Sequence, residues 1–224
     1  MSAAVLSPPA RSHSVQRRPA DQATPPPDET RPSFDADSVD LGSERWKQYE
    51  VVDGQLRERA IGWESELIGA RAGRRMGNWT DDKAVGEVNG SNAVYRCFKS
   101  KRQRRKPDAS FISAEKLKDG YPVGECEIPP DLIVEVVSPR EAYEDTLAKV
   151  QDFFSAGTRL AWIVLPSRRV GFAMRPDGTT TQVNESDAFD GEDVMPGFTM
   201  PLADLLRGVP VRESVGDDVE GDED

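Results

Sequence analysis

DLIVEVVSPREAYEDTLAKVQDFFSAGTRLAWIVL, residues 131–165, is the stretch that decides the fold. Leu132–Val137 is apolar except for Glu135, which is typical of a strand buried on both faces. Apolar residues then recur at helical spacing and predict an amphipathic helix ending near residue 157: Tyr143, Leu147, Val150 and Phe154. Leu160–Leu165 predicts a second buried strand. Strand, helix and strand in succession indicate a crossover onto a neighbouring parallel strand.

The flanking sequence adds strands and a helix to this unit. Tyr49–Arg57 has Asp53-Gly54 between short alternating runs, which predicts a β-hairpin at the start of the domain. Ile61–Trp79 has apolar residues at helical spacing and predicts a helix, although Gly69, Gly73 and Gly77 weaken it. Three more runs predict strands: Ala93–Phe98, Ala109–Ser113 and Val170–Met174. We therefore expect an α/β (α+β) fold with a mixed sheet flanked by helices.

Composition divides the 224 residues into a core and two tails. Residues 1–44 are rich in Pro and Ser and carry a net charge of -3, which indicates a disordered leader. Residues 212–224 carry -6 and indicate an acidic disordered tail. The predicted domain, 45–211, holds 24 basic and 26 acidic side chains, so its net charge is only -2. The overall charge of -11 therefore does not exclude a nucleic-acid partner.

Histidine and cysteine chemistry is limited. The single histidine, His13, lies in the leader, so neither a histidine metal cage nor a Ser-His triad can form in the core. Cys97 and Cys126 are expected to be reduced thiols. No apolar run reaches the roughly 20 residues of a membrane span, and we expect a cytoplasmic protein. Catalysis would have to use carboxylates and lysines.

Three charged residues stand out in the predicted domain. Glu135 lies inside an apolar strand, where a carboxylate needs a cation, a proton or a metal; a structural salt bridge and a catalytic role are both open. Asp108 follows Pro107 at the start of a short strand and could equally cap a turn. Lys149 lies beside the apolar stripe of its helix, and periodicity alone favours a solvated side chain.

Four segments resemble, in order and spacing, the Uma2 family of endonucleases in the PD-(D/E)xK superfamily: RRKPDASFIS at 104–113, PPDLIVEVVSP at 129–139, AKVQDFFSAGTRLAWIVLP at 148–166 and GEDVMPGFTMPLADLL at 191–206. The resemblance covers roughly residues 45–207. It implies a restriction-endonuclease-like fold, with a central mixed sheet flanked by helices.

The resemblance also implies a catalytic set. Asp108 matches the aspartate of the PD motif and Glu135 the acidic member of (D/E)xK, whereas Val137 stands where the lysine is usual. Lys149, on the following helix, matches the place from which this family supplies its lysine. Asp108 and Glu135, with the Val136 carbonyl, would hold Mg²⁺ or Mn²⁺, since hard oxygen ligands favour these ions over zinc. Lys149 would orient or deprotonate water, or stabilise charge on the phosphate.

Two further features are expected near this site. Glu64, on the apolar stripe of the first helix, is a candidate fourth metal ligand, while Glu66 is expected to face away; packing or a salt bridge would explain Glu64 equally well. The basic stretch before Asp108 either is a solvated loop or contacts backbone phosphates. Its nucleic-acid-binding candidates are Lys101, Arg102, Arg104, Arg105 and Lys106.

Two functions therefore remain open from the sequence. The first is a metal-dependent endonuclease that hydrolyses phosphodiesters, with DNA as the expected substrate. The second is a nuclease-fold protein that no longer cuts and binds nucleic acid or protein; the displaced lysine and the acidic tails favour it. A homodimer would suit cleavage of two strands, but no residue indicates one. An interaction protein that docks through its Pro-rich leader is a more distant third.

Overall fold

The computed structural model describes residues 39–211. The leader up to residue 38 (including His13) and the acidic tail lie outside the described residues. The strands are β1 (Tyr49–Val52), β2 (Gln55–Glu58), β3 (Gly86–Gly90), β4 (Ala109–Ser113), β5 (Leu132–Val136), β6 (Leu160–Leu165), β7 (Val170–Met174), β8 (Thr180–Asn184), β9 (Ala188–Asp190) and β10 (Thr199–Pro201). The helices are α1 (Trp63–Asp81), α2 (Tyr143–Ala156), α3 (Leu202–Leu205) and the 3-10 turn η2 (Pro166–Arg168).

A six-stranded mixed sheet forms the centre, in the order β3-β4-β5-β6-β7-β8. Only β5 and β6 are parallel, with Leu132 opposite Leu160 and Val136 opposite Val164. The other neighbours pair antiparallel. The predicted mixed sheet and the strand-helix-strand unit at its centre are confirmed.

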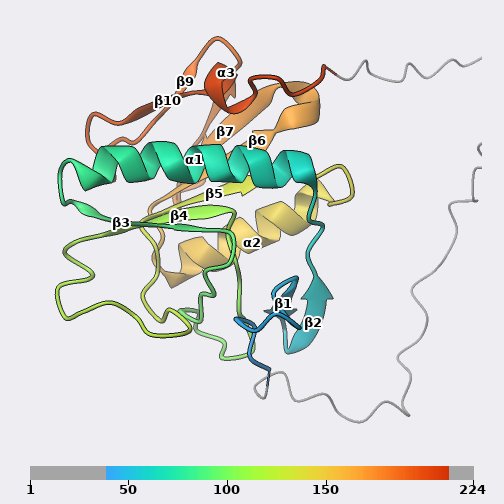
Figure 1. Ribbon diagram of the computed structural model, residues 1–224, viewed down its shortest axis with the longest axis vertical. Coiled ribbons are helices and arrows are strands. Elements are labelled where there is room, and N and C mark those ends of the chain that lie inside the picture. The colour runs from blue at the N-terminus through green and yellow to red at the C-terminus, as the bar shows by residue number, and fades with distance from the viewer. Residues whose placement is uncertain (1–38, 212–224) are drawn as a thin grey trace, which may run out of the picture. The chain divides into compact units, whose positions relative to one another are not determined.

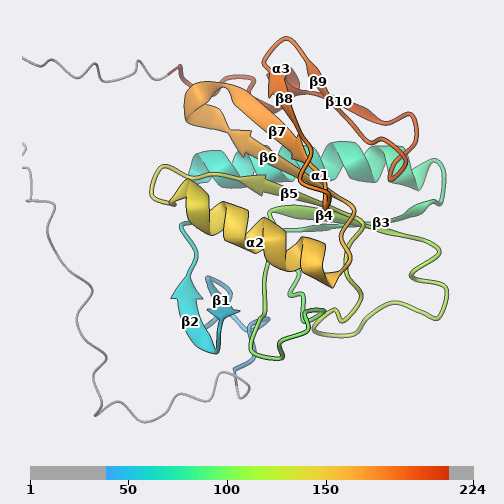
Figure 2. The same cartoon turned by 180° about the vertical axis from the view of Figure 1, so that it is seen from behind.

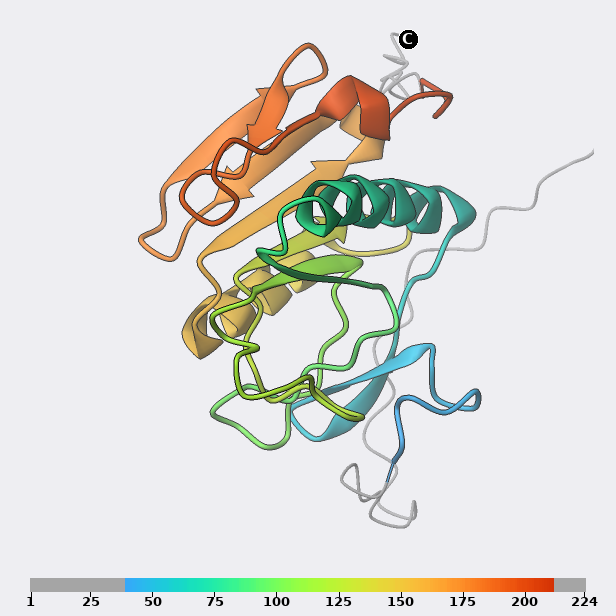
Figure 3. The same cartoon turned by 60° about the vertical axis from the view of Figure 1, so that its left-hand side comes forward.

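The two long helices cover opposite faces of the sheet (Figures 1, 2 and 3). Alternate residues of β5 point to opposite faces. Leu132, Val134 and Val136 belong to the core on the α1 side. Ile133 packs in the core on the α2 side, together with Val150 and Phe153 of that helix. Glu135 has the same parity as Ile133, so the strand directs its one carboxylate toward α2.

The β1–β2 hairpin is separate from the central sheet and has the predicted turn. Asp53 and Gly54 both have positive φ, 51° and 80°, as a two-residue type I′ turn requires. A strand at Ala93–Phe98 was predicted wrongly: Tyr95 forms only isolated bridges, to Arg105 and Cys126. The edge strand β3, which the sequence did not indicate, pairs with β4 instead.

The folded domain begins earlier than the sequence predicted. Residues 39–44 were assigned to the disordered leader, but Leu41 is fully buried and Val39 nearly so, in a cluster with Val51 and Val94. The ammonium of Lys106 donates to the Leu41 carbonyl at 2.7 Å. This segment is therefore part of the fold, because it supplies acceptors to a buried cation.

Two smaller expectations concern membranes and thiols. No helix within residues 39–211 combines the length and apolar character needed to cross a bilayer. Cys97 and Cys126 are free cysteines, as predicted.

The aromatic stack in the α1-side core generates a stability prediction. Trp162 is fully buried and stacks on Phe189 at a centroid distance of 5.1 Å. Trp162→Ala should lower the free energy of unfolding by about 3–5 kcal/mol, because it removes a large side chain and leaves a cavity. Urea denaturation measures the loss. Trp63→Ala is the matched control: with 81% of this residue exposed, a change beyond about 0.5 kcal/mol would contradict the assignment.

Candidate functional site

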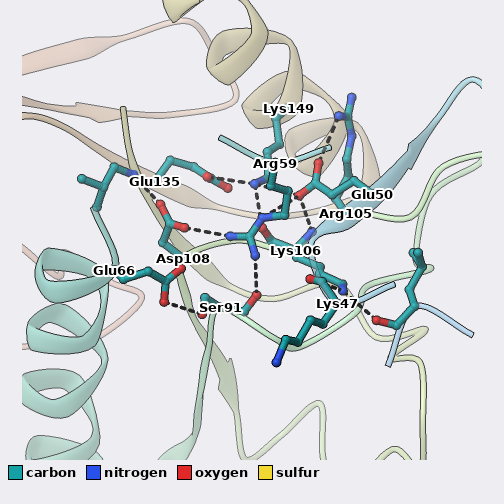
Figure 4. A network of polar contacts seen from close by, with 12 residues as sticks. Lys47, Glu50, Arg59, Glu66, Ser91, Arg105, Lys106, Asp108, Glu135 and Lys149 are labelled. Carbon is teal, nitrogen blue, oxygen red and sulfur yellow. Dashed lines mark hydrogen bonds and ion pairs between the residues drawn. The ribbon is translucent and has the colours of Figure 1, made fainter. Parts of the chain in front are cut away.

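A cavity of about 460 Å³ opens where the carboxyl end of β5 meets α2 and the β1–β2 hairpin. Asp108, Glu135 and Lys149 all line it, as does Val136. The structure therefore brings together the three residues that the sequence singled out (Figure 4). Asp131, at the other end of β5, lies outside this cavity; it pairs with Lys116 at 2.9 Å and caps the strand entrance.

The register of the sheet explains why Asp108 and Glu135 converge. Ala109 of β4 pairs with Val134 of β5 in an antiparallel ladder, so continuation of this register sets Asp108 opposite Glu135. The Asp108 amide donates to the Val134 carbonyl, and Asp108 Oδ2 accepts from the Val136 amide at 2.7 Å. α1 approaches closely at Gly69, where a Cβ atom would lie 3.1 Å from Asp108 Cβ. A larger residue at position 69 would therefore press on Asp108, which would have to shift by a few tenths of an ångström.

Lys149 is buried and fully committed to hydrogen bonds. Its Nζ lies 3.0 Å from Glu135 Oε2 and 3.0 Å from Glu50 Oε1. It also donates to the Lys106 carbonyl at 2.6 Å. The interpretation of Lys149 as a solvated lysine is wrong, because these three acceptors draw its ammonium into the site.

Two site residues, Glu50 and Arg59, were missed by the sequence analysis. Glu50 is 5% exposed and accepts from the Lys106 amide at 2.8 Å. The Arg59 guanidinium donates to Asp108 Oδ1 at 3.0 Å and to the Ser91 carbonyl at 3.0 Å. The available signal for Glu50 was its acidic side chain in an otherwise half-apolar hairpin strand. Arg59, in a short linker, gave no signal of this kind.

Glu135 has one oxygen without a partner. Its Oε1 is buried, and no hydrogen bond to it is made within the structure. Burial raises the pKa of Glu135 to about 8, and the neighbouring Asp108 and Glu50 charges act in the same direction against Lys149. Burial also raises the pKa of Asp108, although Lys149 and Arg59 oppose the shift. A desolvated oxygen of this kind, beside a second carboxylate, fits a ligand for a divalent cation.

The charge of the cavity also fits a cation. Nine carboxylates and five basic side chains line it, so its walls carry a formal charge of -4. Within the described chain, however, no three His, Cys, Asp or Glu side chains already form a metal-binding group. Figure 4 shows that Arg59 lies between Asp108 and Glu50, and that Lys149 lies between Glu135 and Glu50. The residues fit Mg²⁺ or Mn²⁺ by donor type and charge.

The neighbours of Lys149 and Glu50 keep both groups charged. For Lys149, burial works against the ammonium, but Glu135 and Glu50 outweigh it and raise the pKa. For Glu50, burial favours the neutral acid, but Lys149, Arg105 and Arg59 outweigh it and lower the pKa. Lys149 is consequently a cation at neutral pH and is unsuited to accept a proton from water.

The acidic residue that α1 presents to the cavity is Glu66, where the sequence pattern had favoured Glu64. Glu66 lines the cavity and accepts from the Ser91 hydroxyl at 3.2 Å, whereas Glu64 is not among the lining residues. The buried face of α1 keeps Ile68 of the predicted stripe but extends to Ser65 and Gly69, on the side away from Glu64. The assignment of Glu66 to the outer face was wrong for this reason.

The basic stretch is mostly internal. Arg104, Arg105 and Lys106 are 2%, 7% and 0% exposed, so they cannot reach a nucleic-acid backbone as predicted. Arg105 Nε bonds to Asp152 Oδ2 at 2.9 Å, and Lys106 and Arg104 hold carbonyls of the 39–47 segment. Lys101 and Arg102 are the two exposed members of the predicted set.

The raised pKa of Glu135 generates a prediction about pH. Between about 4.5 and 8 the folded chain holds a proton on Glu135 that the unfolded chain has lost, so the free energy of unfolding falls as pH rises through this window. Glu135→Gln removes the titrating group. Between pH 5 and pH 8 its free energy of unfolding should therefore fall by a few kcal/mol less than that of the wild type. Denaturant unfolding without metal, at both pH values, measures it. Parallel pH profiles for the two proteins would contradict the shift.

Comparison with known proteins places this geometry in a family. The Uma2 family, described as "Putative restriction endonuclease", matches residues 36–203. A search of curated proteins finds no match. Among solved structures, one titled a putative nuclease belonging to DUF820, from Anabaena variabilis ATCC 29413, has a TM-score of 0.61 and 17% identity over 70% of this chain and 89% of that chain. This likeness is one of fold. The chain, with its mixed sheet and its cavity lined by Asp108, Glu135 and Lys149, belongs to the Uma2 family.

Proposed function

We propose that this protein is a metal-dependent endonuclease that hydrolyses phosphodiester bonds of DNA, with Mg²⁺ or Mn²⁺ as its cofactor. The observation that carries the proposal is the unpartnered, buried Glu135 Oε1 beside Asp108 in a cavity with net negative walls. Phosphate is itself an anion, so such a cavity would repel it unless a cation is bound. Asp108 and Glu135, with the Val136 carbonyl, would hold this ion, and Glu66 replaces Glu64 as the acidic residue that α1 contributes to the cavity.

The cofactor would neutralise the phosphoryl oxygens and lower the pKa of an attacking water. Among the protein's own groups, Lys149 is positioned to stabilise negative charge, because it is cationic and lies 3.0 Å from Glu135. This narrows the role expected from sequence, where proton abstraction by Lys149 was also open. Glu50 holds Lys149 from the opposite side and serves as a positioning residue.

The cavity rim offers cations for the nucleic-acid backbone. Arg57 and Arg140 both line the cavity, and both are exposed to solvent. Arg57 is only loosely paired, with 3.8 Å to Asp145. These arginines are better placed for phosphate contacts than the buried members of the basic stretch. We assign the backbone contacts to them, with Lys101 and Arg102 as further exposed candidates.

A second function is favoured by one contact. Arg59 Nη2 lies 3.0 Å from Asp108 Oδ1, so a cation from the protein already neutralises the carboxylate that would hold the metal. A chain in which this pair is permanent would be an inactive nucleic-acid-binding or protein-interaction module. Metal-dependent cleavage separates the two functions.

Cleavage of supercoiled plasmid tests the proposed activity. The wild-type protein should nick it with Mg²⁺ or Mn²⁺ and not with EDTA, while Asp108→Asn and Glu135→Gln should lower the rate at least ~100-fold, because each removes a metal-binding charge. Asp131→Asn is the matched control, because Asp131 is as buried as Glu135 but lies outside the cavity. Absence of nicking by folded wild-type protein under all metal conditions would favour the inactive module.

The rim assignment predicts a change in DNA binding. Arg140→Ala, measured with Ca²⁺ in place of Mg²⁺ to prevent cutting, should weaken affinity about three- to tenfold and reduce the slope of log K against log salt by about one. Lys118→Ala is the control, since Lys118 is exposed and does not line the cavity. Equal affinities and slopes for the two variants would refute the rim assignment.

A further inference from the structure

We propose that Arg59 is a built-in counter-cation of the catalytic carboxylates, which competes with the divalent metal and leaves Asp108 when the metal binds. The inference rests on the proposed function and concerns the metal-free protein. Through this competition, Arg59 would lower the affinity of the site for the metal. In this view the chain folds with its carboxylates already neutralised and exchanges a protein cation for a metal ion.

Arg59, in the linker after β2, lines the cavity. Its side chain is 10% exposed and lies among three carboxylates of the cavity: 3.0 Å from Asp108, 3.9 Å from Glu50 and within electrostatic reach of Glu135. The guanidinium donates to Asp108 Oδ1, whereas the Val136 amide donates to the other oxygen, Oδ2. The guanidinium therefore occupies the side of Asp108 from which a metal would be bound.

Arg59 is one of six charged side chains at the centre of the site. The buried centre of the site contains three carboxylates, on Glu50, Asp108 and Glu135, and three cations pair with them: Arg59, Arg105 and Lys149. Counted as fully ionised groups, these six side chains carry no net charge before any metal is bound. A divalent ion held by Asp108 and Glu135 would take Asp108 from Arg59 and leave this guanidinium within a few ångströms of the metal, which is strongly unfavourable in a partly desolvated cavity. One of the three cations has to move.

Of these three cations, Arg59 is the one that can move. Lys149 has three acceptors within 3.0 Å and lies on α2, and Arg105 is fixed by Asp152 and by backbone bridges to Tyr95. Arg59 lies in the four-residue linker between β2 and α1 and faces the cavity. Its side chain can rotate into that space by giving up its bonds to Asp108 and to the Ser91 carbonyl, without breaking a helix or strand.

Titration with MnCl₂ and MgCl₂, without nucleic acid, tests the inference by calorimetry. Arg59→Met removes the cation and keeps most of the apolar stem, so it should bind Mn²⁺ about tenfold or more tightly than wild type. Arg59→Lys keeps the charge and should stay near wild type. Arg104→Met is the matched control: Arg104 is buried and paired with Glu125 but does not line the cavity, so its affinity should not change.

The outcomes separate the inference from the proposed function. Wild-type affinity in Arg59→Met, or weaker binding, overturns the competition and leaves the metal-dependent nuclease standing. Binding by Arg59→Met but not by wild type supports the competition and identifies Arg59 as a block to the metal. No binding by either folded protein overturns the metal site and the competition together.

A measurement on the wild-type protein covers the case in which Arg59→Met does not fold. The Nε–H resonance of Arg59, assigned by its loss in Arg59→Lys, should shift on titration with Mg²⁺ as the Asp108 ion pair breaks. The Nε–H resonance of Arg104 should stay in place. An Arg59 resonance that is unchanged while calorimetry reports bound metal would overturn the inference.

Discussion

The structure depends on one constraint: three carboxylates can be buried side by side only if cations are buried with them. Glu50, Asp108 and Glu135 come from the hairpin, the start of β4 and the end of β5, and each contacts at least one lysine or arginine. Uncompensated burial of a charge costs several kcal/mol. The hairpin, the linker, the sheet and α2 are therefore held together by the same ion pairs that form the cavity. Stability and site geometry are coupled through these residues.

β5 has two tasks, which its alternating faces keep apart. One face, with Leu132, Val134 and Val136, completes the core beneath α1. The other ends in Glu135, beneath α2 and beside Lys149. Because the strand is central and paired on both sides, Glu135 has little freedom to move. A rigid carboxylate with one unpaired oxygen is a suitable starting point for binding an ion, since little order remains to be imposed.

The sequence predicted those parts of the fold whose signal is local. β5, α2 and β6 have long apolar runs or clear periodicity, and the hairpin has the turn Asp53-Gly54. β3 was missed because Gly86–Gly90 contains a single large apolar residue and is a strand only through its pairing with β4. In the site, Glu135 stood out as a carboxylate inside an apolar strand, and family resemblance then grouped Asp108 and Lys149 with it. Arg59 was not, because its partner Asp108 is 49 residues away, and the burial of Arg105 likewise depends on distant contacts.

Lys106 joins the beginning of the domain to the wall of the cavity. Its ammonium holds the carbonyls of Leu41 and Lys47, its amide donates to Glu50, and its own carbonyl accepts from Lys149. Burial lowers the pKa of Lys106 to about 8, so its proton is held less firmly than that of an ordinary lysine. A chain shortened to begin at residue 45 would leave this ammonium without the Leu41 acceptor. The working boundary of the domain is thus set by hydrogen bonding, several residues ahead of its first strand.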